Sequence, residues 1–349
     1  MRIPGVGRLR HMARRLRNRF RPGVLILLYH RVAELPSDPY LLNVTPQHFA
    51  EHLEILRQQG CRLMHLQELI QALQDGNLPH RGVVVTFDDG CVDNLYNAKP
   101  LLERYDIPAT VFVASGHVGQ EREFWWDELD RLLLQPGTLP KTLHLNINGS
   151  TYEWELGNDA HYSEDDQKRD RSWHLYQQDD PTERHRLFRS LHQRLNSLPI
   201  KERWQVLDEL AAWTGAGVRS RSTHRTLFPD EVVDLAKGGL VEVGAHTVTH
   251  PVLSSLPVSA QQDEIWQSKA ELEKILDRPV TSFAYPHGSR SDYTEDTVKV
   301  AQEAGFACAC SNFADMVWRG TDHFQLPRVL VFDWDRETFA RRLEEWLHA

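Results

Sequence analysis

Two adjacent carboxylates, Asp88 and Asp89, are the side chains of this sequence best placed to do chemistry. They follow an apolar run at 83–85, and Gly90 after them permits a sharp turn. The run predicts a buried strand, and burial penalises both neighbouring charges. Such a pair indicates a bound cation or a shared proton at the carboxyl edge of a sheet, where α/β folds build their active sites.

A second set of potential ligands follows another apolar run, at 240–243. His246 and His250 are four residues apart, a spacing that places two imidazoles on one side of a helical turn. We expect that turn to end at His250, because Pro251 disfavours an α conformation there. Two nitrogens and one strand-end carboxylate oxygen are typical of a catalytic zinc site with one position left for water.

These motifs resemble those of the polysaccharide deacetylases, carbohydrate esterase family four. The first family motif corresponds to residues 86–90, and the H-[ST]-x-x-H motif corresponds to residues 246–250. A third motif occurs in altered form at 283–288, where Phe283 stands in place of the arginine that many members have. The first two family motifs therefore contain both the pair of aspartates and the pair of histidines.

The Y-P-x-G ending of the third motif resembles the subgroup associated with bacterial surface polysaccharides. Segments 27–32 and 326–329 are similar to the first strand and a late motif of that subgroup. In all, the resemblance covers roughly residues 24–120 and 225–335.

The resemblance implies a role for each motif residue. Asp88 would be the general base, and the metal would be held by Asp89, His246 and His250. The backbone N–H of Tyr285 would polarise the acetyl carbonyl. The implied reaction removes an N-acetyl group from an amino sugar in a polysaccharide or a glycan precursor. Its cofactor would be Zn²⁺ or another divalent transition metal.

The general acid does not follow from the resemblance. Family members usually carry a histidine in a late segment, whereas residues 326–331 contain none. His30 and His287 are the candidates, and we favour His30 because it directly follows a predicted strand. Arg328 is expected either to orient Asp88 or to bind substrate.

The rest of the chain alternates between predicted strands and helices. Strands are expected at 24–29, 62–64, 83–87, 109–114, 240–243, 283–285 and 307–310. A first helix is expected between its cap, Thr45, and Gly60, with others at 94–105, 229–237, 260–276 and 292–304. This alternation predicts an α/β fold, a distorted parallel (β/α) barrel of about seven strands with a helical and hairpin insertion.

Three parts are expected along the chain: a basic N-terminal arm at 1–22, a barrel domain at 23–349, and an insertion in that domain at 121–225. Within the insertion, alternation and an Asn-Gly turn predict a hairpin at 141–156. Two amphipathic helices are expected to follow at 181–198 and 200–213.

Aromatic residues at the start of the insertion suggest substrate contact. Trp125 and Trp126 are candidate sugar-binding residues, since aromatic faces stack on pyranose rings, and His287 is a third candidate. The alternative for the tryptophans is that they form a buried anchor for the insertion.

The charge of the chain is unevenly distributed. The formal net charge is −9, which excludes a global basic field for nucleic-acid binding, yet residues 1–22 carry eight arginines and no acidic residue. This arm is interpreted as a disordered basic tail or as a peripheral tether to an anionic membrane. We reject a cleaved signal peptide, because the apolar run at 24–29 is short and no cleavage site follows it.

We expect reduced cysteines and a cytoplasmic location. The tether would place the protein at the inner face of the membrane. Cys308 and Cys310 alternate with alanines, as small residues of a buried strand do.

Two alternatives to the N-deacetylase remain open. One is an O-deacetylase or another zinc amidohydrolase of the same fold, and the other is a degenerate, non-catalytic carbohydrate-binding member.

Overall fold

The computed structural model describes residues 22–217 and 220–347, which fall into two compact units. Within that range, the first unit contains residues 22–33, 43–118 and 227–347, and the second contains residues 34–42 and 119–226. The basic arm predicted at 1–22 lies outside the described residues except for Pro22, so the membrane tether and the cytoplasmic location stay predictions.

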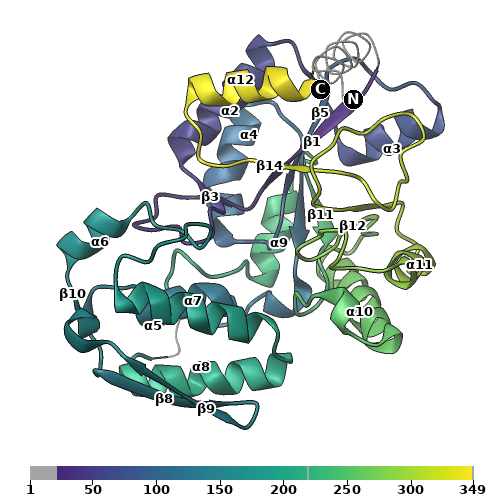
Figure 1. The fold of residues 1–349 in the computed structure, drawn as a ribbon. Coiled ribbons are helices and arrows are strands. Elements are labelled where there is room, and N and C mark those ends of the chain that lie inside the picture. The colour runs from purple at the N-terminus through teal and green to yellow at the C-terminus, as the bar shows by residue number, and fades with distance from the viewer. Residues whose placement is uncertain (1–21, 218–219, 348–349) are drawn as a thin grey trace, which may run out of the picture. The chain divides into compact units, whose positions relative to one another are not determined.

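A parallel eight-stranded sheet forms the framework of the first unit (Figure 1). Its strands lie in the order β13-β12-β11-β6-β5-β1-β14, and β4 pairs with β5 in addition. They are β1 (Val24–Tyr29), β4 (Arg62–Leu63), β5 (Gly82–Phe87), β6 (Ala109–Val113), β11 (Val241–Ala245), β12 (Ser282–Ala284), β13 (Cys308–Cys310) and β14 (Val329–Leu330). The predicted distorted parallel barrel is therefore confirmed.

One short segment, which contains the edge strand β14, links the other edge strand, β13, to β1. Leu326 forms a bridge with Cys310 of β13, whereas Val329 pairs with Leu27 of β1. Arg328 lies between these two pairing positions. The linkage closes the barrel on this side and delivers the side chain of Arg328 to its interior.

Alternate residues of the strands face two different cores. Val83 and Val85 of β5 pack in the large cluster that the surrounding helices cover, whereas Val84 packs in a smaller one. The smaller cluster combines residues of several strands with residues of the helix α3 (Leu66–Gln74) and therefore fills the barrel interior. Its strand residues are Val24, Ile26, Val84, Phe112, Ala284, Cys308 and Cys310. Because strand side chains alternate between faces, Asp88 continues the inward-facing series of Val84 and Thr86.

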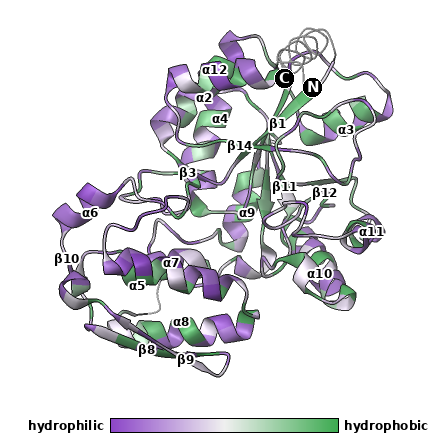
Figure 2. Ribbon diagram, viewed as in Figure 1, coloured by the Kyte–Doolittle hydropathy of each residue, from purple (hydrophilic) through white to green (hydrophobic). Residues whose placement is uncertain are grey.

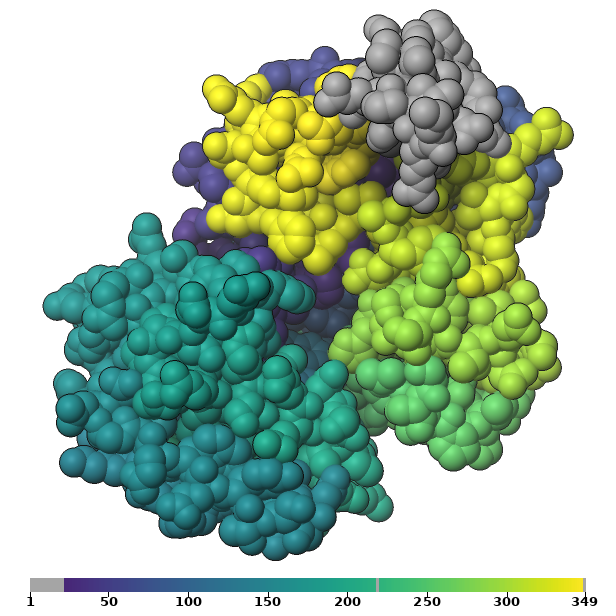
Figure 3. All heavy atoms as spheres, in the orientation of Figure 1, coloured from purple at the N-terminus to yellow at the C-terminus, as the bar shows by residue number. Residues whose placement is uncertain are grey.

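Helices surround the sheet of the first unit. They are α2 (Pro46–Gln58), α3 (Leu66–Gln74), α4 (Lys99–Tyr105), α9 (Pro229–Ala236), α10 (Val258–Leu276), α11 (Glu295–Glu303) and α12 (Arg336–Leu347). The helix predicted at 94–105 is divided into the π-helical η1 (Asn94–Ala98) and α4. Helices α3 and α12 were not predicted from the sequence. Helix α12 packs on α2 and lies at the surface of this unit (Figures 1 and 3, yellow).

The hydropathy of these elements explains their positions. The six residues of β1 are all apolar and all buried, and the strand is correspondingly green in Figure 2. Among the described residues, however, no helix combines the length and the apolar character that crossing a bilayer requires.

The second unit is mostly helical. It contains α5 (Trp125–Leu133), α6 (Glu164–Asp170), α7 (Glu183–Asn196) and α8 (Ile200–Thr214), with the hairpin of β8 (Thr142–Ile147) and β9 (Ser150–Glu155). A short pair joins β7 (Gly137–Thr138) and β10 (His161–Tyr162). The predicted hairpin is confirmed: Asn148 and Gly149 both have left-handed backbone conformations, with φ of 52° and 75°, as its tight turn requires.

Candidate metal and catalytic site

Asp89, His246 and His250 converge at the carboxyl ends of β5 and β11. One potential ligand atom from each lies within 4.8 Å of the other two, and all three residues are buried. Asp89 Oδ1 is 3.6 Å from His246 Nε2 and 3.5 Å from His250 Nε2. Two imidazole nitrogens and one carboxylate oxygen fit Zn²⁺ or a similar divalent transition metal.

The two histidines occupy a loop rather than the predicted helical turn. The N–H of His246 continues the pairing of β11 by donating to the carbonyl of Val113 at 3.0 Å. Thr247 and His250 then adopt left-handed conformations, with φ of 64° and 56°. Non-glycine residues are rarely found there, and such strain concentrates at functional sites. The expected helical turn was wrong because the loop stays paired with the end of β6.

Glu264 of α10 holds this loop in place. Its carboxylate accepts hydrogen bonds from the N–H of Val248 at 2.9 Å, and from the N–H and hydroxyl of Thr249 at 2.8 and 2.5 Å. Three bonds to one ionisable group offset the cost of the unusual backbone conformation. Glu264 was not predicted as a site residue, because one glutamate on an amphipathic helix gives no local signal of such a contact.

The tautomer of His246 suits a metal ligand. Its Nδ1 lies 2.8 Å from the carbonyl oxygen of Ala284, which can only accept, so Nδ1 bears the hydrogen and Nε2 keeps its lone pair. Burial lowers the pKa of His246, and burial lowers the pKa of His250 well below its ordinary value. Both imidazoles are therefore neutral near pH 7, the form in which histidine binds a metal.

Asp88 is paired with Arg328 deep in the same site. The two terminal nitrogens of Arg328 donate to the two carboxylate oxygens of Asp88, each at 2.7 Å. Burial alone raises the pKa of Asp88, but the charge and hydrogen bonds of Arg328 outweigh it, and the pKa lies below its ordinary value. Asp88 is therefore ionised at neutral pH. Of the two roles expected for Arg328, its geometry fits the one that orients Asp88.

Arg328 is itself held by several groups. It is 1% exposed, its Nε donates to the carbonyl of Ser311 at 2.9 Å, and its guanidinium lies 5.5 Å from the centre of the Phe112 ring. A guanidinium with this many contacts has one orientation, so the carboxylate plane of Asp88 is fixed as well.

The structure separates the two candidate general acids. His30 is half-buried, and burial lowers its pKa to about 4 although the charge of Asp88 opposes the shift. The imidazole of His30 is therefore neutral near pH 7 and is not the imidazolium that acts as a general acid, which counts against the preference for His30. His287 is exposed, and its ring lies 4.9 Å from the ring of His250. His287 is thus the candidate that stands at the open side of the metal-ligating set.

The role predicted for the N–H of Tyr285 is not supported. That N–H donates to the carbonyl of Cys310 at 3.1 Å and so continues the pairing of β12 with β13. The side chain is equally occupied, because its hydroxyl donates to the carbonyl of Phe324 at 2.9 Å. A group already used in the sheet cannot polarise an acetyl carbonyl without breaking that pairing.

The tryptophans predicted to bind sugar are buried in the second unit. Trp125 and Trp126 are 5% and 7% exposed. The ring of Trp125 contacts the ring of His192, with centres 5.2 Å apart, and the guanidinium of Arg203, 4.7 Å away; Trp126 stacks on Phe124 at 4.5 Å. Packing already occupies these rings, so the prediction was wrong. They anchor the core of their own unit, which was the stated alternative.

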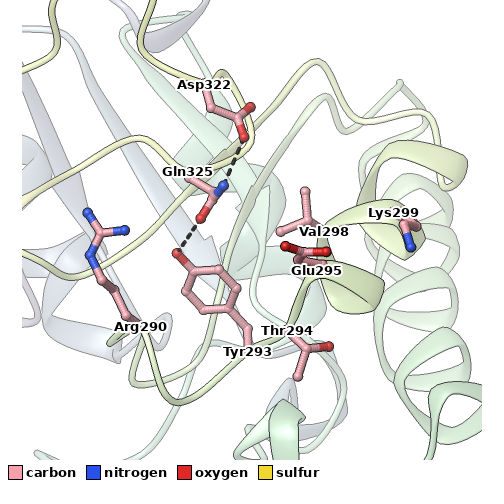
Figure 4. A pocket seen from close by; sticks show the side chains of 8 residues that line it. All are labelled: Arg290, Tyr293, Thr294, Glu295, Val298, Lys299, Asp322 and Gln325. Atoms are coloured by element: carbon pink, nitrogen blue, oxygen red, sulfur yellow. Dashed lines mark hydrogen bonds between the residues drawn. The ribbon is translucent and has the colours of Figure 1, made fainter.

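A surface pocket of about 420 Å³ lies beyond the third motif (Figure 4). The ring of Tyr293, which lines it, stacks on the ring of Tyr285 at 4.2 Å. The other lining residues include two cations and two anions: Arg290, Thr294, Glu295, Val298, Lys299, Asp322 and Gln325. Asp88 and the metal-ligating set do not line this pocket, which is therefore distinct from their site.

Comparison with known proteins agrees with the motifs. The model of the polysaccharide deacetylase family matches residues 75–138 and 199–309. A Staphylococcus aureus poly-beta-1,6-N-acetyl-D-glucosamine N-deacetylase is 34% identical over 109 residues, which are 28% of this chain and 38% of that protein. The chain spans less than half the length of the first curated relatives that it matches.

Two solved structures share the fold. IcaB from Ammonifex degensii superposes with a TM-score of 0.58 at 21% identity, covering 94% of this chain and 98% of that one. The Streptococcus pyogenes deacetylase PplD in complex with acetate gives 0.52 at 19% identity, covering 92% and 99%. With fold, motifs and family model in agreement, this chain belongs to the polysaccharide deacetylase family.

Proposed function

We propose that this protein is a metal-dependent hydrolase that removes N-acetyl groups from an amino sugar in a polysaccharide or a glycan precursor. One observation supports the proposal above the others. An ionised carboxylate, Asp88, lies beside a ligand set formed by Asp89, His246 and His250, with 3.9 Å between Asp88 Oδ2 and His246 Nε2. A base and a divalent cation site in contact are what hydrolysis of an acetamide needs.

The chain's own residues account for the proton transfers. A metal at the site would polarise the acetyl carbonyl and lower the pKa of water. Asp88 accepts a proton from the water that attacks the acetyl carbon, while Arg328 keeps its carboxylate oriented. The C–N bond then breaks, and the nitrogen takes up a proton as the amine leaves. The products are acetate and the free amino sugar.

The proton for the leaving amine comes either from Asp88, which holds it after the attack, or from His287. His287 is favoured over His30 by its exposed position against His250 and by the neutral state of His30. The intact base and ligand set argue against a degenerate, non-catalytic member, because the pairing with Arg328 accounts for Asp88 alone and leaves the buried Asp89 and the two histidines beside it without a purpose.

O-deacetylation is a second candidate, and one observation favours it. The late segment contributes Arg328, a permanent cation that does not release its proton, where the family usually has a histidine. An alkoxide leaving from an ester needs less help from an acid than an amine does. An ester substrate would therefore tolerate this site better than an amide.

Release of acetate tests the function directly. The full chain, loaded with Zn²⁺, is incubated with N-acetylated glucosamine oligomers and, separately, with O-acetylated sugars. The proposal predicts acetate release from the N-acetylated oligomers, its loss in Asp88→Asn, and its loss on chelation with recovery on adding metal back. Release only from the O-acetylated sugars would favour the second candidate, and release from neither would contradict both.

A further inference from the structure

Two exposed aromatic side chains lie beside the turn that carries the catalytic aspartates. Tyr96 belongs to η1, which follows this turn, and Phe228 directly precedes α9. Their exposed fractions are 59% and 38%. Leu227 attaches Phe228 to the turn itself, because the N–H of Leu227 donates to the carbonyl of Gly90 at 3.2 Å.

Glu231 holds both aromatic residues with one carboxylate. Its Oε1 accepts from the hydroxyl of Tyr96 at 2.8 Å, and its Oε2 accepts from the N–H of Phe228 at 2.8 Å. Glu231 is only 6% exposed, so its own position is set by packing. These bonds fix the hydroxyl end of Tyr96 and the backbone at Phe228 on the same carboxylate, so the two residues are positioned side by side before any ligand arrives, which reduces the entropy lost on binding.

The topology places this pair at the edge of the sheet where the site lies. The helix η1 comes after the carboxyl end of β5, which also delivers Asp88. The helix α9 precedes β11. In a parallel α/β sheet, a helix that leads into a strand begins at the edge of the sheet where the carboxyl ends of the strands lie. Phe228 at the start of α9 therefore lies at the same edge as His246, which follows β11.

We propose that Tyr96 and Phe228 form a platform that binds a pyranose ring of the glycan, next to the sugar whose acetyl group is removed. The inference deepens the proposed function and rests on it. One face of a pyranose is lined by C–H groups and stacks on aromatic rings, while its hydroxyl groups stay in water. Exposed rings on two residues that bond to one buried carboxylate suit this task, unlike the buried Trp125 and Trp126.

Binding to an inactive protein tests the platform separately from catalysis. In the Zn²⁺-loaded Asp88→Asn protein, affinity for a β-1,6-linked N-acetylglucosamine oligomer is measured by calorimetry. Adding Tyr96→Ala or Phe228→Ala should each weaken binding about tenfold, on the order expected for one aromatic contact. Tyr96→Phe and Phe228→Tyr keep the rings and should retain most of the affinity. Trp266→Ala, which removes another exposed aromatic ring, should change nothing.

The outcomes separate the platform from the proposed reaction. If the oligomer does not bind, or if both alanine variants bind it as tightly as the parent with metal content and fold intact, the platform is overturned. If the alanine variants lose binding while the wild-type protein releases no acetate from any glycan, the platform stands and the proposed hydrolysis fails. Loss of affinity in Trp266→Ala to the same degree would also overturn the platform.

Discussion

Arg328 and Asp88 form a buried pair in which two parallel hydrogen bonds of 2.7 Å join the guanidinium to the carboxylate. The residues are 240 positions apart in the chain. They meet because the segment linking β13 to β1 places Arg328 over the carboxyl end of β5. This pair keeps the base ionised and sets its direction.

Arg328→Met should therefore move the acid limb of the pH–rate profile to higher pH. Burial is the largest influence on Asp88 and raises its pKa, and without the guanidinium the strongest opposing influence is lost. The variant should also lose about 3–5 kcal/mol of stability, since a buried carboxylate is left without its cation. Rate profiles and urea unfolding measure the two effects. An acid limb that stays in place would show that Arg328 does not control the ionisation of Asp88.

Metal content should depend on the ligand set and not on the base. Elemental analysis of protein purified without added metal should give about one equivalent, and the double variant His246→Ala, His250→Ala should bring it to background. Asp88→Asn should keep the metal and lose turnover, whereas Asp89→Asn should lose both. Retention of metal by Asp89→Asn and its loss from Asp88→Asn would reverse the two assignments.

Glu264→Gln should lower metal affinity without unfolding the protein. Glutamine keeps one acceptor of the three-bond contact with Val248 and Thr249, so the loop of His246 and His250 is held less firmly. Positioning contacts of this kind are typically worth about 10- to 100-fold in affinity. Zn²⁺ competition with a chromophoric chelator measures the change. Asp263→Asn, on the same helix but exposed, is the matched control and should bind metal normally.

Metal-free protein should lose stability as the pH falls below about 6.5. Burial lowers the pKa of several histidines, including His52, His117 and His185, to about 4. Between the unfolded value near 6.5 and the folded value, the unfolded chain binds protons that the folded chain does not. Each such histidine lowers the unfolding free energy by about 1.4 kcal/mol for every unit by which the pH falls within this window.

Comparing urea unfolding at pH 7 and pH 5 checks this slope. His52→Gln removes one titrating ring and should reduce the slope by about one proton. An unchanged slope in that variant would mean that His52 does not stay neutral in the folded protein.

Alanine substitutions at the two candidate general acids should slow turnover to different degrees. We expect His287→Ala to slow turnover of an N-acetyl substrate more than His30→Ala does, because His287 is exposed against His250 and His30 is neutral near pH 7. Loss of a general acid typically costs about 10²–10⁴-fold. Activity on an O-acetyl substrate serves as the internal control and should fall less. Equal rates for both variants and the parent would leave Asp88 as the sole proton carrier.

Local patterns in the sequence were sufficient to predict the strands of the sheet and the types of residue that offer ligands to a metal. All seven predicted strands occur in the structure, because an apolar run bounded by turn residues has few ways to be buried. The spacing of His246 and His250 also indicated their shared function, although the backbone between them is a loop held by Glu264 and not a helical turn.

Local sequence patterns could not predict which side chains are buried in the folded protein. Trp125 and Trp126 have the composition of a sugar platform, but helices elsewhere in their unit cover them. His30 follows a strand as expected, yet burial lowers its pKa to about 4 and keeps the imidazole neutral near pH 7. Neither the burial of the tryptophans nor this desolvation could be predicted locally, because solvent exposure is a property of the packed molecule and not of a stretch of residues.

The sequence by itself determined the family, the parallel strands and the residues that offer nitrogen and oxygen to a metal, since these depend on residue types at short spacing. Only the tertiary structure decided that Arg328 orients Asp88, that the N–H of Tyr285 is used in the sheet, and that Glu231 accepts hydrogen bonds from both Tyr96 and Phe228. These contacts join distant parts of the chain, and closing the barrel is what brings them together.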